Sequence, residues 1–177
     1  MNDRREEFRL LYEAHAARVL AYALRRVPRE EAFDVVADTF LVAWRRLGEI
    51  PQDAVPWLFS VARRVIANQR RSTRRKDALA TRVEASSAGL LGQPDPADEV
   101  TTRVSIVAAL DRIPDWDRQA LMLVAWEHLD NRRAAAAMGC SRATFAVRLH
   151  RARRRLHDQL DAMNEDAPFR ALTEEAR

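Results

Sequence analysis

The chain contains few of the residues that mark secreted, membrane or disulfide-rich proteins. Among 177 residues there is one cysteine, Cys140, which excludes an internal disulfide and favours a reducing compartment. The longest uninterrupted apolar run, 120–126, is far shorter than the roughly 20 residues that a membrane-spanning helix needs. The charged N-terminus lacks the apolar core of a signal peptide. We therefore expect a cytoplasmic protein without a membrane-inserted segment.

The sequence also lacks the groupings that enzymes use. It contains no nucleophile–base pair and no glycine-rich loop that would hold a phosphate. Asp34 and Asp38 stand four residues apart, but no histidine or third acid joins them at ligand spacing, which argues against a metal site. His150 lies among arginines without a ligand partner and is interpreted as a surface residue. We expect no enzymatic activity, no cofactor and no metal.

Positive charge is plentiful, and all but one of the 30 basic residues are arginine, the exception being Lys76. Alanine is abundant too, so codon bias explains part of this count. The distribution is more informative: net charge is +3 over 1–72, −1 over 73–102, +5 over 103–160 and −3 over 161–177. Two basic blocks suit a polyanion contacted at two places, although ordinary solvated surfaces would give the same pattern.

Apolar residues recur at three- and four-residue steps along most of the chain, which predicts an all-α protein without strands. A first helix ends at Pro28, and further helices are expected over about 29–47, 57–75, 101–113, 115–128, 131–138 and from 141 onward. Serine, proline and acidic residues gather at 84–100, as in linkers. We predict two small helical domains, 1–75 and 103–160, joined by a flexible linker, 76–102, and followed by a frayed acidic tail, 161–177.

The segment from Asp130 to Leu156 has the pattern of a helix-turn-helix. The alanines 134–137 allow close approach of a second helix, Gly139 suits a left-handed turn, and Ser141 is a natural N-cap. Cys140 would pack in the corner. Two stripes follow, one expected to be buried (Phe145, Leu149, Ala152 and Leu156) and one outward (Thr144, Arg148, Arg151 and Arg155). Spacing alone supports DNA recognition and a basic helical hairpin equally.

Two helices of the N-terminal half carry patterned polar faces. In 34–47 the two aspartates share one face, which favours a solvated or protein-docking surface. The apolar residues Phe33, Val36, Phe40, Ala43, Trp44 and Leu47 are expected to face the interior. In 56–71, Trp57 and Phe59 interleave with arginine and amide side chains, an arrangement that suits single-stranded nucleic acid, although the two aromatic residues taken alone favour core packing.

Taken together, these segments resemble extracytoplasmic-function (ECF) sigma factors, the compact two-domain members of the sigma-70 family. "EEAFDVVADTFLVAWRRL" resembles a helix of region 2, and "PWLFSVARRVIANQRRSTRR" resembles the helix that follows it. Residues 109–156, from "ALDRIP" to "RLHRARRRL", resemble region 4. The resemblance covers about 6–75 and 103–160, in the expected order.

Several positions depart from the family pattern. Ala37 and Val42 stand where glutamine and arginine are common, and Arg64 replaces an asparagine. In the helix-turn-helix, Arg132 and Arg133 replace an acidic pair, Ala134 replaces a larger aliphatic residue, and Ala146 and Val147 replace basic and serine residues. A divergent member that reads its own promoter sequence is the interpretation we favour.

The resemblance implies a non-enzymatic subunit of RNA polymerase. Such a subunit binds core RNA polymerase (the β′ clamp helices and the β subunit) and promoter DNA, and it directs promoter melting and transcription initiation. An anti-sigma factor is a further partner that it implies. The polymerase contacts fall on Asp34, Asp38, Thr39 and Arg45. The −10 contacts fall on Trp57, Arg63, Arg64, Asn68 and Arg71, with the loop 48–56. The −35 contacts fall on Arg142, Thr144, Arg148, Arg151 and Arg154, with Arg153 and Arg155 as further phosphate contacts.

A stand-alone helix-turn-helix regulator is the main alternative. Such a protein would bind duplex DNA without polymerase, and it needs no acidic docking helix followed by an aromatic-basic one. A helical adaptor or membrane-surface protein, whose arginines only solubilise it, is a second alternative.

Overall fold

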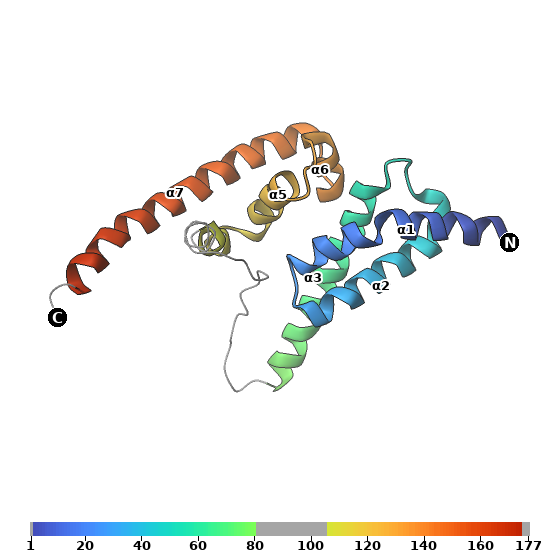
Figure 1. The fold of residues 1–177 in the computed structure, drawn as a ribbon, viewed down its shortest axis with the longest axis horizontal. Helices are drawn as coiled ribbons and strands as arrows, with labels where there is room; N and C mark the ends of the chain where they lie inside the picture. The colour runs from blue at the N-terminus through green and yellow to red at the C-terminus, as the bar shows by residue number, and fades with distance from the viewer. Residues whose placement is uncertain (1, 81–105, 175–177) are drawn as a thin grey trace. The chain divides into compact units, whose positions relative to one another are not determined.

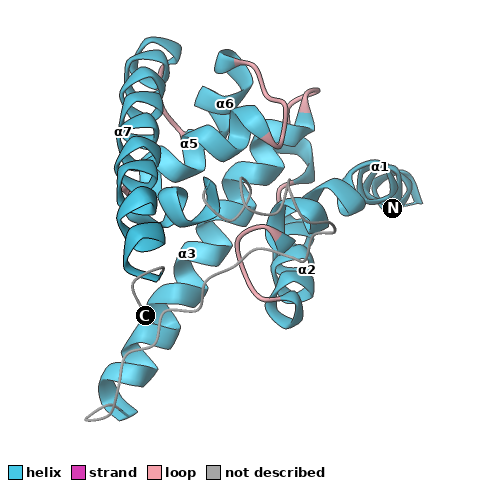
Figure 2. Ribbon diagram, turned by 60° about the vertical axis from the view of Figure 1, so that its left-hand side comes forward, coloured by secondary structure: helices cyan, strands magenta, loops and turns pink. Residues whose placement is uncertain are grey.

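The computed structural model describes the backbone of residues 2–80 and 106–174, and the side chains of 3–73 and 106–163. Within these ranges the chain forms only helices and loops (Figure 2). It divides into two compact units, Met1–Gly92 and Gln93–Arg177. The predicted all-α fold with two helical domains is thus confirmed.

The first unit is built from three long helices and one short turn of helix (Figure 1). These are α1 (Asn2–Leu24), α2 (Arg29–Arg45), the 3-10 helix η1 (Leu47–Glu49) and α3 (Ala54–Ala80). Each of the three long helices packs against the other two. Pro28 separates α1 from α2, and its carbonyl oxygen accepts the first backbone hydrogen bonds of α2.

Aromatic side chains from all three long helices form the core of this unit. The rings of Tyr22 and Phe59 stack at 4.4 Å, and both side chains are fully buried. The buried Arg26 lies 3.5 Å from the centre of the Tyr22 ring, so its charge is held against an aromatic face. A second cluster joins α1 to α2 through Phe8, Tyr12, Phe40 and Trp44.

The second unit contains the helical residues 106–112, α5 (Asp115–Ala125), α6 (Asn131–Met138) and α7 (Arg142–Glu174). Helices α5, α6 and α7 pack against one another in pairs. Phe145, Leu123 and Leu129 are the largest fully buried side chains here.

The helix bounds differ from the predictions at several ends. α2 ends at Arg45 rather than at 47, and α5 ends at Ala125 rather than at 128. α3 continues to Ala80, into the predicted linker, and α7 continues to Glu174, through the predicted frayed tail. Local composition cannot locate such ends, because alanine-rich and charged residues also favour helix. The predicted linker beyond residue 80 lies outside the described residues.

The Tyr22–Phe59 stack gives a stability prediction for the first unit. We expect Phe59→Ala to lower the free energy of unfolding of this unit by about 3–5 kcal/mol, because a buried aromatic ring is removed. The matched control is Phe33→Ala, whose side chain is 53% exposed and should change stability little. Hydrogen exchange of α1 and α3 backbone amides measures both; equal protection in the two variants would contradict the prediction.

Candidate DNA-binding and protein-docking surfaces

The turn between α6 and α7 has capping contacts at both helix starts. The backbone N–H groups of Arg132 and Arg133 donate to Asp130 Oδ1 at 2.8 and 2.9 Å, which caps α6. Gly139 closes α6 with φ of 68°, a left-handed conformation that disfavours side chains. Ser141 Oγ accepts the Thr144 N–H at 3.1 Å and caps α7. The predicted glycine turn and serine cap are confirmed.

The alanine run of α6 meets its neighbours on one side only. Ala134, Ala135 and Ala137 are buried, whereas Ala136 is exposed. The prediction that all four face a neighbouring helix is therefore wrong for Ala136. Four consecutive residues span most of a helical turn, so they cannot all lie on one face. The three buried alanines still allow α7 to approach α6 closely, and Cys140 is half-buried in the corner between them.

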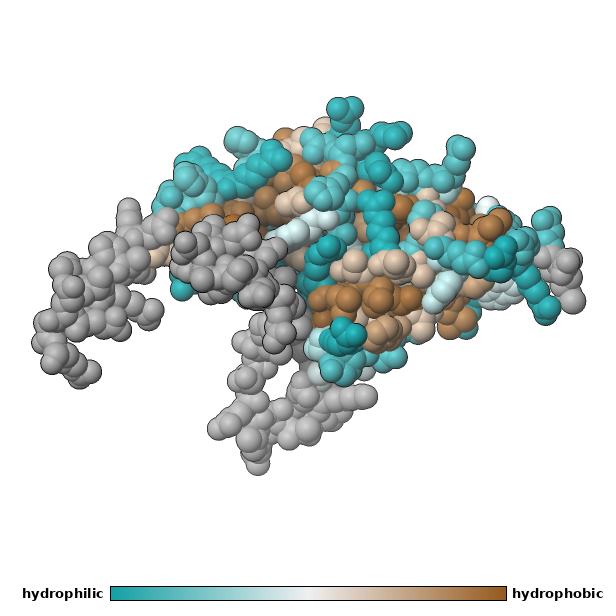
Figure 3. Space-filling model, viewed as in Figure 1, coloured by the Kyte–Doolittle hydropathy of each residue, from teal (hydrophilic) through white to brown (hydrophobic). Residues whose placement is uncertain are grey.

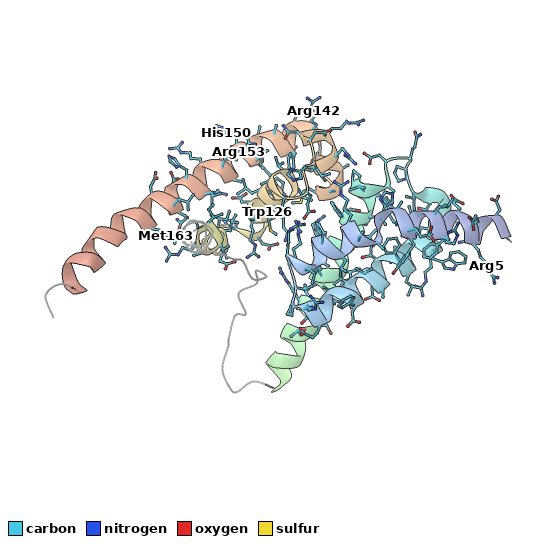
Figure 4. The ribbon with its side chains drawn as sticks, viewed as in Figure 1. Arg5, Trp126, Arg142, His150, Arg153 and Met163 are labelled. Carbon is cyan, nitrogen blue, oxygen red and sulfur yellow. The ribbon has the colours of Figure 1, made fainter. Side chains whose placement is uncertain are left out.

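Helix α7 buries the predicted stripe and leaves the opposite face open. Phe145, Leu149 and Ala152 are buried, and Leu156 is half-buried. Residues two positions earlier lie about 200° around the helix, on the far side from this stripe. Those residues are Ala143, Val147, His150 and Arg154, and all four are exposed. Polar side chains line the outer edge of α7 in Figure 3, and Figure 4 labels Arg142 and His150 along it.

The predicted outward stripe is exposed, and two of its arginines also contact α5. The Arg148 guanidinium lies 4.9 Å from the centre of the Trp116 ring, and Arg155 forms an ion pair with the buried Asp117. Both arginines thus fasten α7 to α5. Thr144 is exposed, and its Oγ1 takes part in the Ser141 cap at 2.9 Å. The prediction that this stripe faces outward is confirmed, whereas the contacts of Arg148 and Arg155 with α5 were not expected from the sequence.

The other basic candidates of α7 are open to solvent. Arg142, Arg151, Arg153 and Arg154 are exposed, and among the described residues none of them forms a hydrogen bond or ion pair. Arg142 opens α7, so its charge lies beside the backbone N–H groups of the first turn. These four guanidinium groups are available to phosphate oxygens and base edges. His150, interpreted from the sequence only as surface, shares this exposed face.

Helix α2 shows the same two-residue offset between its inner and outer faces. The buried residues Ala32, Val35, Thr39 and Ala43 follow steps of three and four, and the residues two positions later are all exposed. These are Asp34, Ala37, Leu41 and Arg45, which we call the α2 face. Phe33 and Asp38 flank it and are exposed as well. Apolar side chains gather over α2 in the view of Figure 3.

Two predictions on α2 are wrong. Thr39 is 0% exposed, so it cannot contact a partner; its Oγ1 has no hydrogen-bond partner among the described residues. Phe33 was expected inside but is 53% exposed, and Leu41, which is 46% exposed, was not singled out. In both cases the prediction followed the residue type. Thr39 is polar and was placed on the surface, and Phe33 is aromatic and was placed in the core, but the position of a residue around the helix axis decides whether it is buried.

The predicted −10 residues lie along α3 with different exposures. Trp57 and Arg63 are half-buried, whereas Arg64, Asn68 and Arg71 are exposed. Arg71 donates a hydrogen bond to Asn68 Oδ1, which links two of the candidates. The structure therefore brings Arg64, Asn68 and Arg71 to the surface of one helix. Phe59, whose ring stacks on Tyr22, belongs to the core.

Three charged or titratable side chains, His15, Arg18 and Asp53, lie near one another at the start of α3. Half-burial and the nearby charge of Arg18 lower the pKa of His15, and Asp53 partly offsets this. Arg18 also lies 5.8 Å from the centre of the Phe59 ring. His15 and Arg18 come from α1 and Asp53 from the loop before α3, so only folding brings them together.

Two negative findings hold for the described residues. They contain no helix with the length and apolar character needed to cross a membrane. They also contain no group of three or more histidine, cysteine, aspartate or glutamate side chains placed to hold a metal ion.

The two units together define a two-part helical protein with a helix-turn-helix in its C-terminal unit. Comparison with known families gives the assignment: residues 11–76 match the model of Sigma-70 region 2, and residues 103–156 match Sigma-70, region 4. The chain belongs to the sigma-70 family and is an RNA polymerase sigma factor of the ECF group. Sigma factors of this family are non-enzymatic initiation factors.

Individual relatives agree with this assignment. The chain is 32% identical over 152 residues to the ECF RNA polymerase sigma factor SigL of Mycobacterium tuberculosis, covering 84% of this chain and 85% of that one. It is 31% identical to the RNA polymerase sigma factor NccH of Alcaligenes xylosoxydans xylosoxydans, covering 84% of each.

Solved structures show the same fold. The structure of CnrH in complex with the cytosolic domain of CnrY aligns with a TM-score of 0.60 at 26% identity, covering 88% of each chain. The sigma factor RpoE of Bartonella quintana, solved with the anti-sigma factor NepR, aligns with a TM-score of 0.68 at 24% identity. That alignment covers 88% of this chain and 98% of RpoE.

The Asp130 cap makes the turn sensitive to acid. The two backbone N–H bonds and the adjacent arginines lower the Asp130 pKa in the folded state. The stabilisation is therefore fully present above the unfolded pKa of about 3.9 and is lost as pH falls through the lower folded pKa. We expect Asp130→Asn, which keeps an accepting oxygen, to remove this acid dependence. Amide exchange of Arg132 and Arg133 between pH 6 and pH 2.5 measures it; unchanged acid opening in the variant would contradict the prediction.

Proposed function

We propose that this sigma factor docks its α2 face on core RNA polymerase, opens the −10 element with α3, and reads the −35 element with α7. The observation that supports this most directly is the presence, in one chain, of an exposed acidic–apolar face on α2 and an open basic face on α7. A stand-alone regulator would need only the basic face of α7, because it binds DNA without polymerase.

The docking contact rests on Asp34, Asp38, Leu41 and Arg45. Leu41 lies near the middle of the α2 face with charged groups around it, the arrangement of an apolar anchor with a polar rim. The β′ clamp helices are the proposed partner, with the β subunit contacting the chain elsewhere. Thr39 is buried beneath this surface and is not proposed as a contact residue.

The −10 contact rests on α3 and the loop before it. Extruding a base from the duplex costs a few kcal/mol, which aromatic stacking and a cationic surface return. Arg64, Asn68 and Arg71 supply the exposed polar surface, and the half-buried Trp57 and Arg63 border it. His15 and Arg18, close to the loop, are additional candidates for contacts to the displaced strand.

The −35 contact rests on α7, whose N-terminal turns would enter the major groove. Arg142, Thr144 and Arg151 are proposed for base edges and nearby phosphates, and Arg154 for phosphate alone. Arg148 lies over Trp116, which holds its guanidinium at the border of the groove-facing surface and suits a phosphate contact rather than a central base contact. Arg155 is paired with Asp117 and has a structural role.

An anti-sigma factor is a proposed third partner. CnrH was solved with the cytosolic domain of CnrY, and RpoE with the anti-sigma factor NepR. We further propose that the chain has no catalytic activity of its own and works in the cytoplasm, where core polymerase is.

Run-off transcription tests the proposal. Purified core polymerase is supplied with a library of genomic fragments, with and without the full-length chain. We expect new, discrete transcripts only when the chain is present. Duplex binding by the chain alone, with no initiation by the mixture at any fragment, would favour the stand-alone regulator and overturn the proposal.

The docking surface gives a separate prediction. We expect Leu41→Ala to weaken binding to core polymerase about ten-fold, because the anchor of the α2 face is removed without disturbing the buried stripe. The matched control is Leu10→Ala, which removes a leucine that is 54% exposed on α1 and should bind as the unaltered chain does. Fluorescence anisotropy with labelled chain measures both; equal affinities of the two variants would count against this docking face.

A further inference from the structure

Val147 is the feature of α7 that the proposed contacts leave unexplained. Its side chain is 54% exposed, although an exposed β-branched aliphatic residue neither favours helix nor improves solubility. It is the only large apolar side chain on the exposed face of α7 within the described residues. An exposed apolar side chain amid arginines points to a contact surface that is itself partly apolar.

Val147 lies in the middle of the exposed face of α7, the face that we propose enters the major groove. It is the sixth residue of α7, within the two N-terminal turns that enter the major groove in helix-turn-helix complexes. It lies on the side directly opposite the buried stripe, with Ala143 one turn before it and His150 one turn after it. Ala143 and Ala146 beside it are too short to hold the helix away from base edges.

The surrounding charges fix what kind of surface Val147 meets. Arg142, Arg151 and Arg154 lie exposed around it and suit a polyanion, so an apolar protein partner at this face would bury unpaired guanidinium groups. The apolar group that a base edge presents in the major groove of duplex DNA, between the two phosphate backbones, is the C5-methyl of thymine. A valine cannot hydrogen-bond to any base edge, so a methyl contact is the readout open to it.

We propose that Val147 is a specificity-determining residue that packs against a thymine methyl group in the −35 element. This rests on the proposed function, because it requires α7 to lie in the major groove. The selectivity is for an A·T pair over G·C at one position, read by shape rather than by hydrogen bonds. Burial of one methyl group corresponds to a change of about three- to five-fold in affinity.

The test removes the methyl group from the DNA and its partner from the protein. A promoter found by run-off transcription is prepared with each −35 thymine, on either strand, replaced in turn by deoxyuridine, which lacks only the C5-methyl. Holoenzyme containing the unaltered chain should lose about three- to five-fold in affinity at one position. Holoenzyme containing Val147→Ala should bind the thymine and deoxyuridine versions of that position equally.

Controls separate this contact from general weakening. Leu10→Ala, which loses an aliphatic side chain of equal exposure in the other unit, should keep the full deoxyuridine penalty. No penalty at any position, an unchanged penalty in Val147→Ala, or a −35 element without thymine on either strand would each overturn the inference. Failure to initiate at every promoter would instead overturn the proposed function on which it rests.

Discussion

The burial of a single stripe on each helix is the constraint on which both binding surfaces depend. In α2 the small and apolar residues Ala32, Val35 and Ala43, with Thr39 among them, pack inward; in α7 the stripe that starts at Phe145 does so. Because successive residues are 100° apart, each buried stripe leaves the residues two positions away pointing to solvent. The core therefore selects which side chains a partner can meet.

Contacts between helices then fix the position of α7 and the ends of α6 and α7. Arg148 on Trp116 and Arg155 on Asp117 fasten α7 to α5 along its border, and the Asp130 and Ser141 caps fix where α6 ends and α7 begins. An interface built on such supported side chains needs less ordering when it binds. Within the described residues, the arginines of α7 thus fall into two groups: Arg148 and Arg155 contact α5, and the others are open to solvent, where we propose that they meet DNA.

Some departures from the family pattern fall on the two exposed faces, whereas Ala134, which replaces a larger aliphatic residue, is buried in α6. Ala37 lies on the α2 face, and Ala146 and Val147 lie on the exposed side of α7. Replacements at Ala37, Ala146 and Val147 change exposed side chains and leave the buried ones unaltered. The fold common to the family is thereby retained while the partner-facing chemistry changes.

The sequence alone determined the helical fold, the two domains, the glycine turn with its serine cap and the family, because these follow from periodicity, capping chemistry and motif order. It placed Thr39 and Phe33 on the wrong sides of α2, did not predict that Arg148 and Arg155 contact α5, and ended α3 and α7 too early. Only the tertiary structure decided these, because the phase of a helix and the partner of a long arginine depend on neighbouring helices. Those neighbours are distant in sequence, so local patterns carry no information about them.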